Sequence, residues 1–141
     1  MIFEGLSGFP ITPINNGNVD FDVLCNIRNH IDQAGLDSIG VLGSTGSFAY
    51  LSELERTSVI ECWGEAKTPW IAGVSATTTS EAIRYCHIAE KSGAQGVIAN
   101  AFAYVPLHPE ELKRYFLHIA DYSPLPLCVY DNPVTTGQVL S

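Results

Sequence analysis

Short apolar runs alternate with amphipathic segments along the whole chain, and this alternation restricts the possible folds more than any other feature of the sequence. The apolar runs are continuous rather than alternately polar, which is typical of parallel strands buried on both faces of a sheet. The expected strands are residues 6–12, 38–42, 70–74, 96–99 and 126–130. One strand and its following helix take about thirty residues, the size of a βα repeat. The fold class is therefore α/β.

Capping signals mark where the intervening helices begin and end. The first helix is expected between Asp20 and Gly35, with a packed face of Phe21, Leu24, Ile27, Ile31 and Ala34. Residues 52–55 and 78–81 both have the pattern of a capping box, so two further helices should begin there. A last helix should begin at Pro109, because a proline and two acids suit a helix N-terminus.

Composition places the chain among globular proteins. With 46% hydrophobic and 16% charged residues, residues 1–141 are expected to form a single domain. The formal net charge of −8 argues against a nucleic-acid partner, which requires a basic face. The longest apolar runs are too short to cross a bilayer, and the N-terminus lacks a signal-peptide pattern. We therefore expect a cytoplasmic protein without a membrane partner.

Cysteines and histidines are scattered, which argues against a metal centre. No C-x-x-C pair occurs among Cys25, Cys62, Cys86 and Cys128, so free buried thiols are favoured over zinc ligation or a disulfide framework. The four histidines lack a partner at metal-binding spacing. We expect no metal and no cofactor.

One turn has the composition of an anion-binding site. Gly43-Ser44-Thr45-Gly46 follows the second expected strand and offers two hydroxyls and unhindered backbone N–H groups to a carboxylate or a phosphate. Tyr130 ends the fifth expected strand. Together the two motifs indicate a small-molecule enzyme site. Alone, the turn could serve as a helix cap and Tyr130 as a packed aromatic.

Two architectures accommodate five βα units. An open doubly wound sheet can be completed within 141 residues. A (β/α)8 barrel takes about 250 residues and would be only partly present. Length favours the open sheet, whereas the motifs favour the barrel.

The order and spacing of several motifs resemble the dihydrodipicolinate synthase/N-acetylneuraminate lyase family of class I aldolases. The matching residues are Ile11-Thr12-Pro13, Gly43-Ser44-Thr45-Gly46, Gly73, Gly93-Ala94, Gly96, Tyr104, Glu110-Glu111-Leu112, Tyr130, Pro133, Thr136 and Gly137. The resemblance implies a (β/α)8 TIM barrel, of which this chain supplies about the first five strands and four helices.

The resemblance also implies a reaction. In the family, a lysine on strand six forms a Schiff base with pyruvate or a related 2-keto acid, and the iminium stabilises carbanion character while a carbon–carbon bond is made or broken. The turn of Gly43, Ser44, Thr45 and Gly46 would bind the keto-acid carboxylate. Tyr130 would transfer protons through Ser44 and Tyr104. In many members the tyrosine matching Tyr104 comes from a neighbouring subunit, which implies a homodimer or homotetramer.

The chain departs from the family pattern at several positions. The strand-six lysine is not among the 141 residues, and Lys67, Lys91 and Lys113 fall in helices or their exits, so we expect the 141 residues alone to be inactive. Thr135 stands where the synthases have an arginine, and Ser47 where a glutamate is common. These departures favour a sugar-acid lyase or aldolase over a true dihydrodipicolinate synthase.

Two other interpretations remain open at the level of sequence. A flavodoxin-like electron carrier would be acidic and of this length, although its phosphate-binding loop should follow the first strand rather than the second. A non-catalytic half-barrel fragment would have two unpaired sheet edges and would be prone to aggregate or to pair with another copy.

Overall fold

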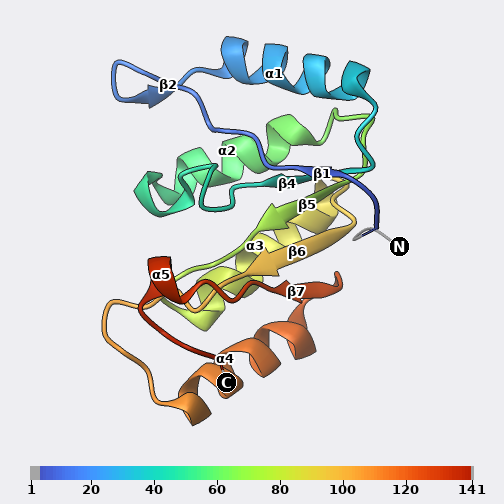
Figure 1. Cartoon of the computed structure of the whole chain (residues 1–141). Helices are drawn as coiled ribbons and strands as arrows, with labels where there is room; N and C mark the ends of the chain where they lie inside the picture. The colour runs from blue at the N-terminus through green and yellow to red at the C-terminus, as the bar shows by residue number, and fades with distance from the viewer. Residues whose placement is uncertain (1–3, 141) are drawn as a thin grey trace.

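The computed structural model of the protein describes residues 4–140, in which a five-stranded parallel sheet is the central element (Figure 1). The strands are β1 (Ser7–Gly8), β4 (Ser38–Val41), β5 (Trp70–Gly73), β6 (Gly96–Ala99) and β7 (Leu127–Val129). They lie side by side in chain order. A doubly wound sheet would place its first strand in the interior. The consecutive order therefore excludes the open sheet and agrees with the first five strands of a (β/α)8 barrel.

One helix follows each of the first four strands of this sheet. These are α1 (Phe21–Ala34), α2 (Glu53–Trp63), α3 (Thr79–Lys91) and α4 (Pro109–Tyr122). They follow one another along the sheet, from α1 at the top of Figure 1 to α4 at the bottom, and each contacts the next. The sheet thus has a helical layer of the kind that surrounds a barrel.

Three short elements were not expected from the sequence. A hairpin of β2 (Ile14–Asn15) and β3 (Asn18–Val19) turns through Asn16 and Gly17, which have φ values of 50° and 82°. A 3-10 turn, η1 (Phe48–Tyr50), follows the Gly43–Gly46 segment, and α5 (Pro133–Thr136) follows β7. The hairpin lies outside the main sheet. The 3-10 turn η1 contributes Phe48 to the wall of the cavity described below, and α5 borders a second cavity next to it.

Helix ends agree with the capping signals, with one correction. The Asp20 carboxylate accepts from the Val23 N–H at 3.0 Å, and Gly35 ends α1 with a φ of 72°. The capping box at residues 52–55 is complete. At the start of α3 only half of the expected box forms, because the Glu81 carboxylate accepts a hydrogen bond from the Tyr85 hydroxyl at 3.1 Å.

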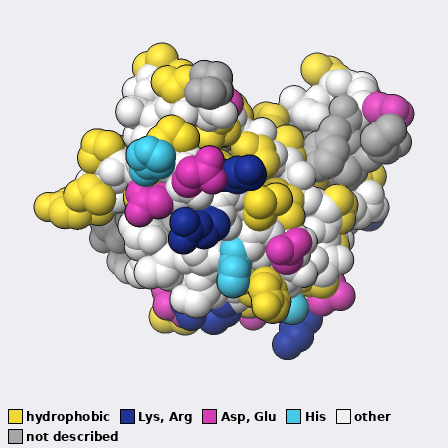
Figure 2. All heavy atoms as spheres, turned by 90° about the horizontal axis from the view of Figure 1, so that it is seen from below, with side chains coloured by type: hydrophobic (Ala, Val, Ile, Leu, Met, Phe, Trp, Pro, Cys, Tyr) yellow, Lys and Arg dark blue, Asp and Glu magenta, His cyan; other side chains and the backbone are white. Residues whose placement is uncertain are grey.

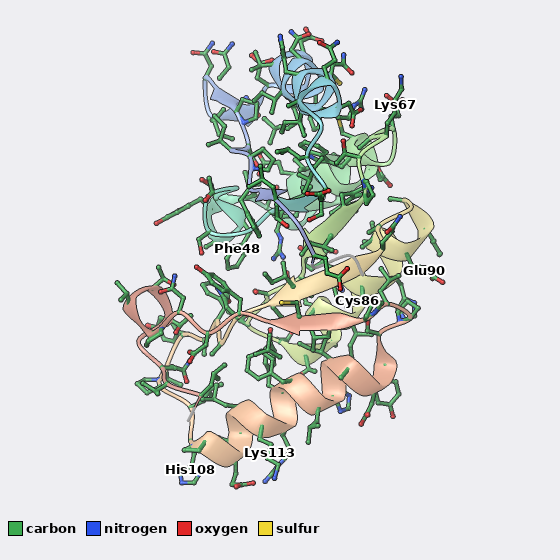
Figure 3. The ribbon with its side chains drawn as sticks, turned by 45° about the vertical axis from the view of Figure 1, so that its right-hand side comes forward. Phe48, Lys67, Cys86, Glu90, His108 and Lys113 are labelled. Atoms are coloured by element: carbon green, nitrogen blue, oxygen red, sulfur yellow. The ribbon has the colours of Figure 1, made fainter. Side chains whose placement is uncertain are left out.

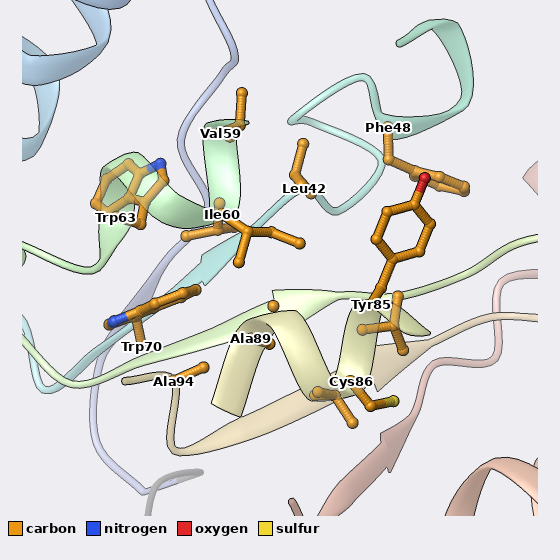
Figure 4. Packing of buried hydrophobic residues seen from close by; sticks show 14 of the residues in the cluster. Leu42, Phe48, Val59, Ile60, Trp63, Trp70, Tyr85, Cys86, Ala89 and Ala94 are labelled. Atoms are coloured by element: carbon orange, nitrogen blue, oxygen red, sulfur yellow. The ribbon is translucent and has the colours of Figure 1, made fainter. Parts of the chain in front are cut away.

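The hydrophobic core lies between the sheet and its helices. All residues of β4, β5 and β6 are buried, as expected for strands covered on both faces. Figure 3 places Phe48 and Cys86 in the interior and Lys67, Glu90 and Lys113 at the periphery. The close view in Figure 4 shows Trp63 of α2 and Trp70 of β5 together with Ala89 and Ala94. This packing joins the middle three strands to α2 and α3.

Both the strand and the helix of the first βα unit differ from the expected pattern. Strand pairing of β1 ends at Gly8, because Pro10 has no N–H to continue the ladder. On α1, Phe21 and Ala34 are exposed, whereas Arg28 is buried. This helix lies at the β1 end of the sheet, where no further helix of the described range covers it.

Mixed charge covers the face of the molecule seen from below α4. Figure 2 shows Lys and Arg beside Asp and Glu on this face, with hydrophobic side chains between them. A continuous basic field, which a nucleic-acid partner would need, is not present on this face. Within residues 4–140, no helix is long and apolar enough to cross a membrane.

A carboxylate on α1 fastens this helix to the loop before β5. Asp32 Oδ1 accepts hydrogen bonds from the Thr68 N–H at 2.9 Å and the Thr68 hydroxyl at 2.8 Å. The Lys67 N–H lies 3.1 Å from both carboxylate oxygens. Partial burial raises the pKa of Asp32, but the hydrogen bonds from Thr68 and Lys67 outweigh it, and the pKa is lowered from its ordinary value of 3.8.

We predict that Asp32→Asn in the complete protein lowers the free energy of unfolding by about 1–2 kcal/mol at pH 7. A lowered folded-state pKa stabilises the fold above pH 3.8, and this contribution is lost as the pH falls through the folded-state value. Urea unfolding at pH 7 and at pH 3 measures both effects. Asp121→Asn, an exposed position near the end of α4, is the matched control and should change little. An equal loss at both pH values would contradict the role of the Asp32 charge.

Candidate functional site

A cavity of about 250 Å³ opens at the carboxyl ends of the parallel strands. Its polar lining comes from four different strand ends and consists of Ser44, Thr45, Ser75, Asn100 and Tyr130. Phe9, Phe48 and Ile98 are among the apolar residues that complete the wall. Active sites of barrel enzymes lie at this edge of the sheet. None of the lining residues in the described range 4–140 has a charged side chain.

Close packing around Leu42 sets the position of the Gly43–Gly46 turn. Leu42 is buried and has a left-handed backbone with a φ of 56°, which an aliphatic residue rarely adopts. Its carbonyl oxygen lies against Gly73 of β5, where any Cβ would overlap it. On its other side, a Cβ at Gly46 would lie 2.8 Å from the Leu42 Cα. The turn therefore requires glycine at both positions.

The segment after β1 also holds the Gly43–Gly46 turn in place. Thr12 is buried, and its hydroxyl donates a hydrogen bond to the Gly46 carbonyl at 2.8 Å. The side chains of Ser44 and Thr45 are exposed toward the cavity side of the turn, while Gly46 is buried beneath them. Of the four residues expected to bind an anion, Gly43, Ser44 and Thr45 line the cavity and Gly46 supports it.

Tyr130 enters the same cavity from the end of β7. Its backbone N–H donates to the Ala99 carbonyl at 2.8 Å, which continues the β6–β7 ladder by one residue. Its hydroxyl accepts a hydrogen bond from the Asn132 side-chain amide at 3.0 Å. Ser44 and Tyr130 thus line one cavity, although no hydrogen bond joins their hydroxyls among the described residues.

Sequence reasoning missed two polar residues on the cavity wall, Ser75 and Asn100. The Ser75 hydroxyl accepts from the Asn100 N–H at 2.9 Å, which links the ends of β5 and β6. The side-chain oxygen of Asn100 is buried and has no hydrogen-bond partner among the described residues. An unpaired buried acceptor costs about 1–3 kcal/mol. Both residues directly follow apolar strands, the position at which Tyr130 was recognised.

A buried cation lies behind the cavity wall. The guanidinium of Arg56 donates from Nη2 to the Gly73 carbonyl at 3.3 Å and stacks 3.9 Å from the ring of Tyr85. It also lies 5.3 Å from the ring of Phe48, a wall residue. Burial lowers the pKa of Arg56, and the nearby Tyr85 and Glu81 oppose this shift. Arg56 therefore contacts the residues of the cavity wall from behind and does not itself line the cavity.

Tyr104 is separate from the cavity of its own chain. It is 95% exposed on the loop between β6 and α4, and it lines neither cavity that borders the Ser44 turn. Gln138 fastens this loop, since its Nε2 donates to the Ala101 carbonyl at 2.8 Å and its Oε1 accepts from the Leu107 N–H at 2.9 Å. Sequence reasoning did not identify Gln138, which lies 31 residues from Leu107.

No lysine of residues 4–140 lines the cavity. Lys67 lies in the loop that leads into β5, at the opposite end of the strand from the cavity, and Lys113 lies on the outer helix α4 (Figure 3). Lys91 is the exposed last residue of α3. Within residues 4–140, no group of three or more His, Cys, Asp or Glu side chains has the geometry of a metal site.

Comparisons with known proteins identify the family. The model of the dihydrodipicolinate synthetase family matches residues 2–141. The chain belongs to this family. It is 36% identical to the 4-hydroxy-tetrahydrodipicolinate synthase of Methanospirillum hungatei, over 97% of this chain and 49% of the relative. The predicted family and the predicted barrel fold are confirmed.

Solved structures of the family agree with this fold. The dihydrodipicolinate synthase of Agrobacterium tumefaciens is 38% identical with a TM-score of 0.93, over 99% of this chain and 48% of that one. YagE of Escherichia coli K12, a family member solved in complex with pyruvate, is 27% identical with a TM-score of 0.90, over 99% of this chain and 48% of that one. The chain thus spans about half the length of the family members that it matches. The flavodoxin-like interpretation is excluded.

We predict that Gly73→Ala in the complete family member lowers the free energy of unfolding by at least about 3 kcal/mol, because the new methyl group would displace the Leu42 carbonyl and the turn after it. Urea unfolding measures the loss. Gly43→Ala is the matched control, since its methyl group would meet only the Phe9 ring, at 3.5 Å and 3.9 Å. Equal unfolding midpoints for the two variants would contradict this account of the turn.

Proposed function

We propose that the complete protein is a Schiff-base-forming lyase or aldolase that makes or breaks a carbon–carbon bond next to pyruvate or a related 2-keto acid. One observation carries this proposal: in a chain of the dihydrodipicolinate synthetase family, the Ser44-Thr45 turn and Tyr130 line one cavity at the carboxyl edge of the sheet. A cytoplasmic location fits such an enzyme.

The turn supplies the binding interaction for the keto-acid carboxylate. Ser44 and Thr45 offer hydroxyl donors, and the glycine-rich backbone from Gly43 to Gly46 allows close approach of the anion. Hydrogen bonds between neutral donors and a carboxylate are charge-assisted, so they bind the anion without a cation in the wall. The keto carbon is then directed toward the cavity interior.

Tyr130 is suited to proton transfer at that carbon. A phenol has an ordinary pKa of about 10, so it needs a hydrogen-bond network and a nearby cation to act near neutral pH. The Asn132 amide already donates a hydrogen bond to its hydroxyl, which orients that hydroxyl in the cavity. The iminium of the Schiff base would supply the cation, and Ser44 would receive or return the proton.

The lysine of the Schiff base would come from a part of the protein outside these 141 residues. No lysine lines the cavity, so residues 1–141 alone should form no pyruvate adduct. A non-catalytic half-barrel is the alternative. The exposed apolar side chains of Leu6, just before edge strand β1, and of Val129, on edge strand β7, are what either a second half or a partner copy would cover.

Tyr104 would act from a neighbouring subunit. Its side chain is 95% exposed on a loop that Gln138 holds in place, so it is available to enter another chain's cavity. We therefore propose a homodimer, or a homotetramer built from dimers. A monomeric dihydrodipicolinate synthase variant has been characterised among the structural relatives, so assembly is open to test.

We predict that the complete protein, treated with pyruvate and borohydride, gains the mass of one reduced pyruvate adduct per chain. Tyr130→Phe should still form the adduct, but its turnover should fall at least about 100-fold because proton transfer is lost. Intact-mass spectrometry measures the adduct and steady-state kinetics measure the turnover. Tyr122→Phe, an exposed position on α4, is the matched control and should keep full activity.

Each outcome of this experiment separates one part of the proposal from another. No adduct on the wild-type protein would remove the pyruvate chemistry and leave the family fold. An adduct with unchanged turnover in Tyr130→Phe would remove only the role of Tyr130.

The uncharged wall favours a hydroxylated substrate over a dicarboxylic one. By the resemblance to the family, Thr135 stands where the synthases have an arginine, and among the described residues no basic side chain lines the cavity to bind a second carboxylate. The unpaired side-chain oxygen of Asn100 can accept a hydrogen bond from a substrate hydroxyl. We therefore propose a sugar-acid substrate or product.

We predict that Asn100→Val lowers kcat/KM for a polyhydroxylated aldehyde about 10- to 100-fold, since one hydrogen bond is worth about 1–3 kcal/mol there. For a deoxy aldehyde of the same length it should change kcat/KM little. The matched control is Ile98→Val on the same wall, which should affect both aldehydes alike. An equal loss for both aldehydes in Asn100→Val would contradict recognition of a hydroxyl by Asn100.

A further inference from the structure

Two cysteines that are far apart in the sequence meet between the outer helices. Cys25 of α1 and Cys62 of α2 place their sulfur atoms 3.7 Å apart, and both residues are half-buried. All four cysteines of the chain are free thiols in this structure. The sequence predicted buried thiols, which holds for Cys86 alone. A disulfide bond is about 2.05 Å long, so the two sulfurs need to approach by only about 1.7 Å.

The surroundings of the pair hold the two helices in this arrangement. Arg28, three residues after Cys25, donates from Nη1 to the Cys62 carbonyl at 2.6 Å and lies 3.7 Å from the Cys62 sulfur. Its Nη2 forms an ion pair with Glu65 at 2.7 Å. These contacts join α1 to the end of α2 and to Glu65 just after it. In none of them does a thiol donate the hydrogen bond. The sulfurs can therefore join without separating the helices.

Burial and the neighbouring Cys25 raise the pKa of the Cys62 thiol to about 11, against the opposing effect of Arg28. At neutral pH Cys62 is therefore protonated, and no charge on Cys62 keeps the two sulfurs apart. The charged groups of the described residues that act on Cys62 are Arg28 from α1 and Glu65, two residues after the end of α2. Thiolate attack becomes faster as the pH rises toward this value.

We propose that Cys25 and Cys62 are a redox-sensitive modification site that forms a reversible disulfide between α1 and α2. The oxidant is a low-molecular-weight disulfide. The thiolate of one cysteine attacks a sulfur of this oxidant and releases one thiolate, which leaves a mixed disulfide on the protein. The second cysteine loses its proton and attacks the protein sulfur of that mixed disulfide, which releases the other half of the oxidant. The protein loses two hydrogen atoms and the oxidant is reduced to two thiols.

The cross-link would restrain the part of the chain that carries the anion-binding turn. The loop closed by residues 25 and 62 includes β4, the Gly43–Gly46 turn and η1. A disulfide stabilises a fold mainly by restricting the unfolded chain, and more so for a long loop. The oxidised protein should therefore unfold at a temperature several degrees higher than the reduced protein. This inference is independent of the proposed function.

The test uses the complete protein treated with oxidised glutathione at pH 8 and then with dithiothreitol. We expect intact mass to decrease by two hydrogen atoms, peptide mapping to join the peptides of Cys25 and Cys62, and dithiothreitol to reverse both results together with the gain in melting temperature. In Cys62→Ser the thiol of Cys25 should instead retain one glutathione, and in Cys25→Ser the thiol of Cys62 should do so. The matched control is Cys128→Ser, which removes a half-buried thiol on β7 and should still form the bond.

A persistent glutathione adduct on Cys25 or Cys62 of the wild-type protein, or a disulfide that maps to another pair, would overturn the proposal. Free thiols at both positions after this treatment would do the same. Mapping is carried out on the wild-type protein, so the result does not depend on the folding of any variant.

Discussion

The register of the parallel strands decides where every residue of the candidate site lies. Gly73 pairs with Ile98, and Ala99 pairs with Val129, so neighbouring strands end at the same edge of the sheet. The polar wall residues follow the last paired position of their strand by one to four places, and they are Ser44, Thr45, Ser75, Asn100 and Tyr130. Residues from four separate βα units thus reach one cavity because hydrogen-bonded strands, rather than side-chain contacts, align them.

The close packing of Leu42 between Gly73 and Gly46 positions the turn, but it requires a strained backbone at Leu42. A left-handed backbone at a non-glycine residue such as Leu42 costs about 1 kcal/mol or more. Complete burial of a leucine side chain is worth about 1.5–3 kcal/mol, which offsets that cost. Gly73 and Gly46 contribute no side-chain burial of their own, yet only glycine permits the contacts on both sides of Leu42. The strain therefore falls on the residues that flank the Gly43–Gly46 turn, because Ser47 directly after it also has a left-handed backbone, with a φ of 58°.

Local signals in the sequence predicted the elements better than the contacts between them. The strand at Gly96–Ala99 and the caps at Asp20 and Ser52 depend on adjacent residues, and the structure has them as expected. By contrast, Arg28 is buried on α1 because it pairs with Glu65 and the Cys62 carbonyl, partners that are more than thirty residues away. Asn100 was missed for a related reason. A single polar residue after an apolar strand has no local pattern that distinguishes a wall position from an ordinary loop.

Charge in the cavity has a distribution that suits the proposed chemistry. The wall is neutral, and Arg56 is held behind it by the Gly73 carbonyl and the ring of Tyr85. A cation inside the wall would compete with the iminium for the substrate carboxylate and would disfavour formation of the iminium by like-charge repulsion. Neutral donors on the Ser44 turn would bind the carboxylate without this repulsion. The iminium would then be the main positive charge near Tyr130, which is where proton transfer requires it.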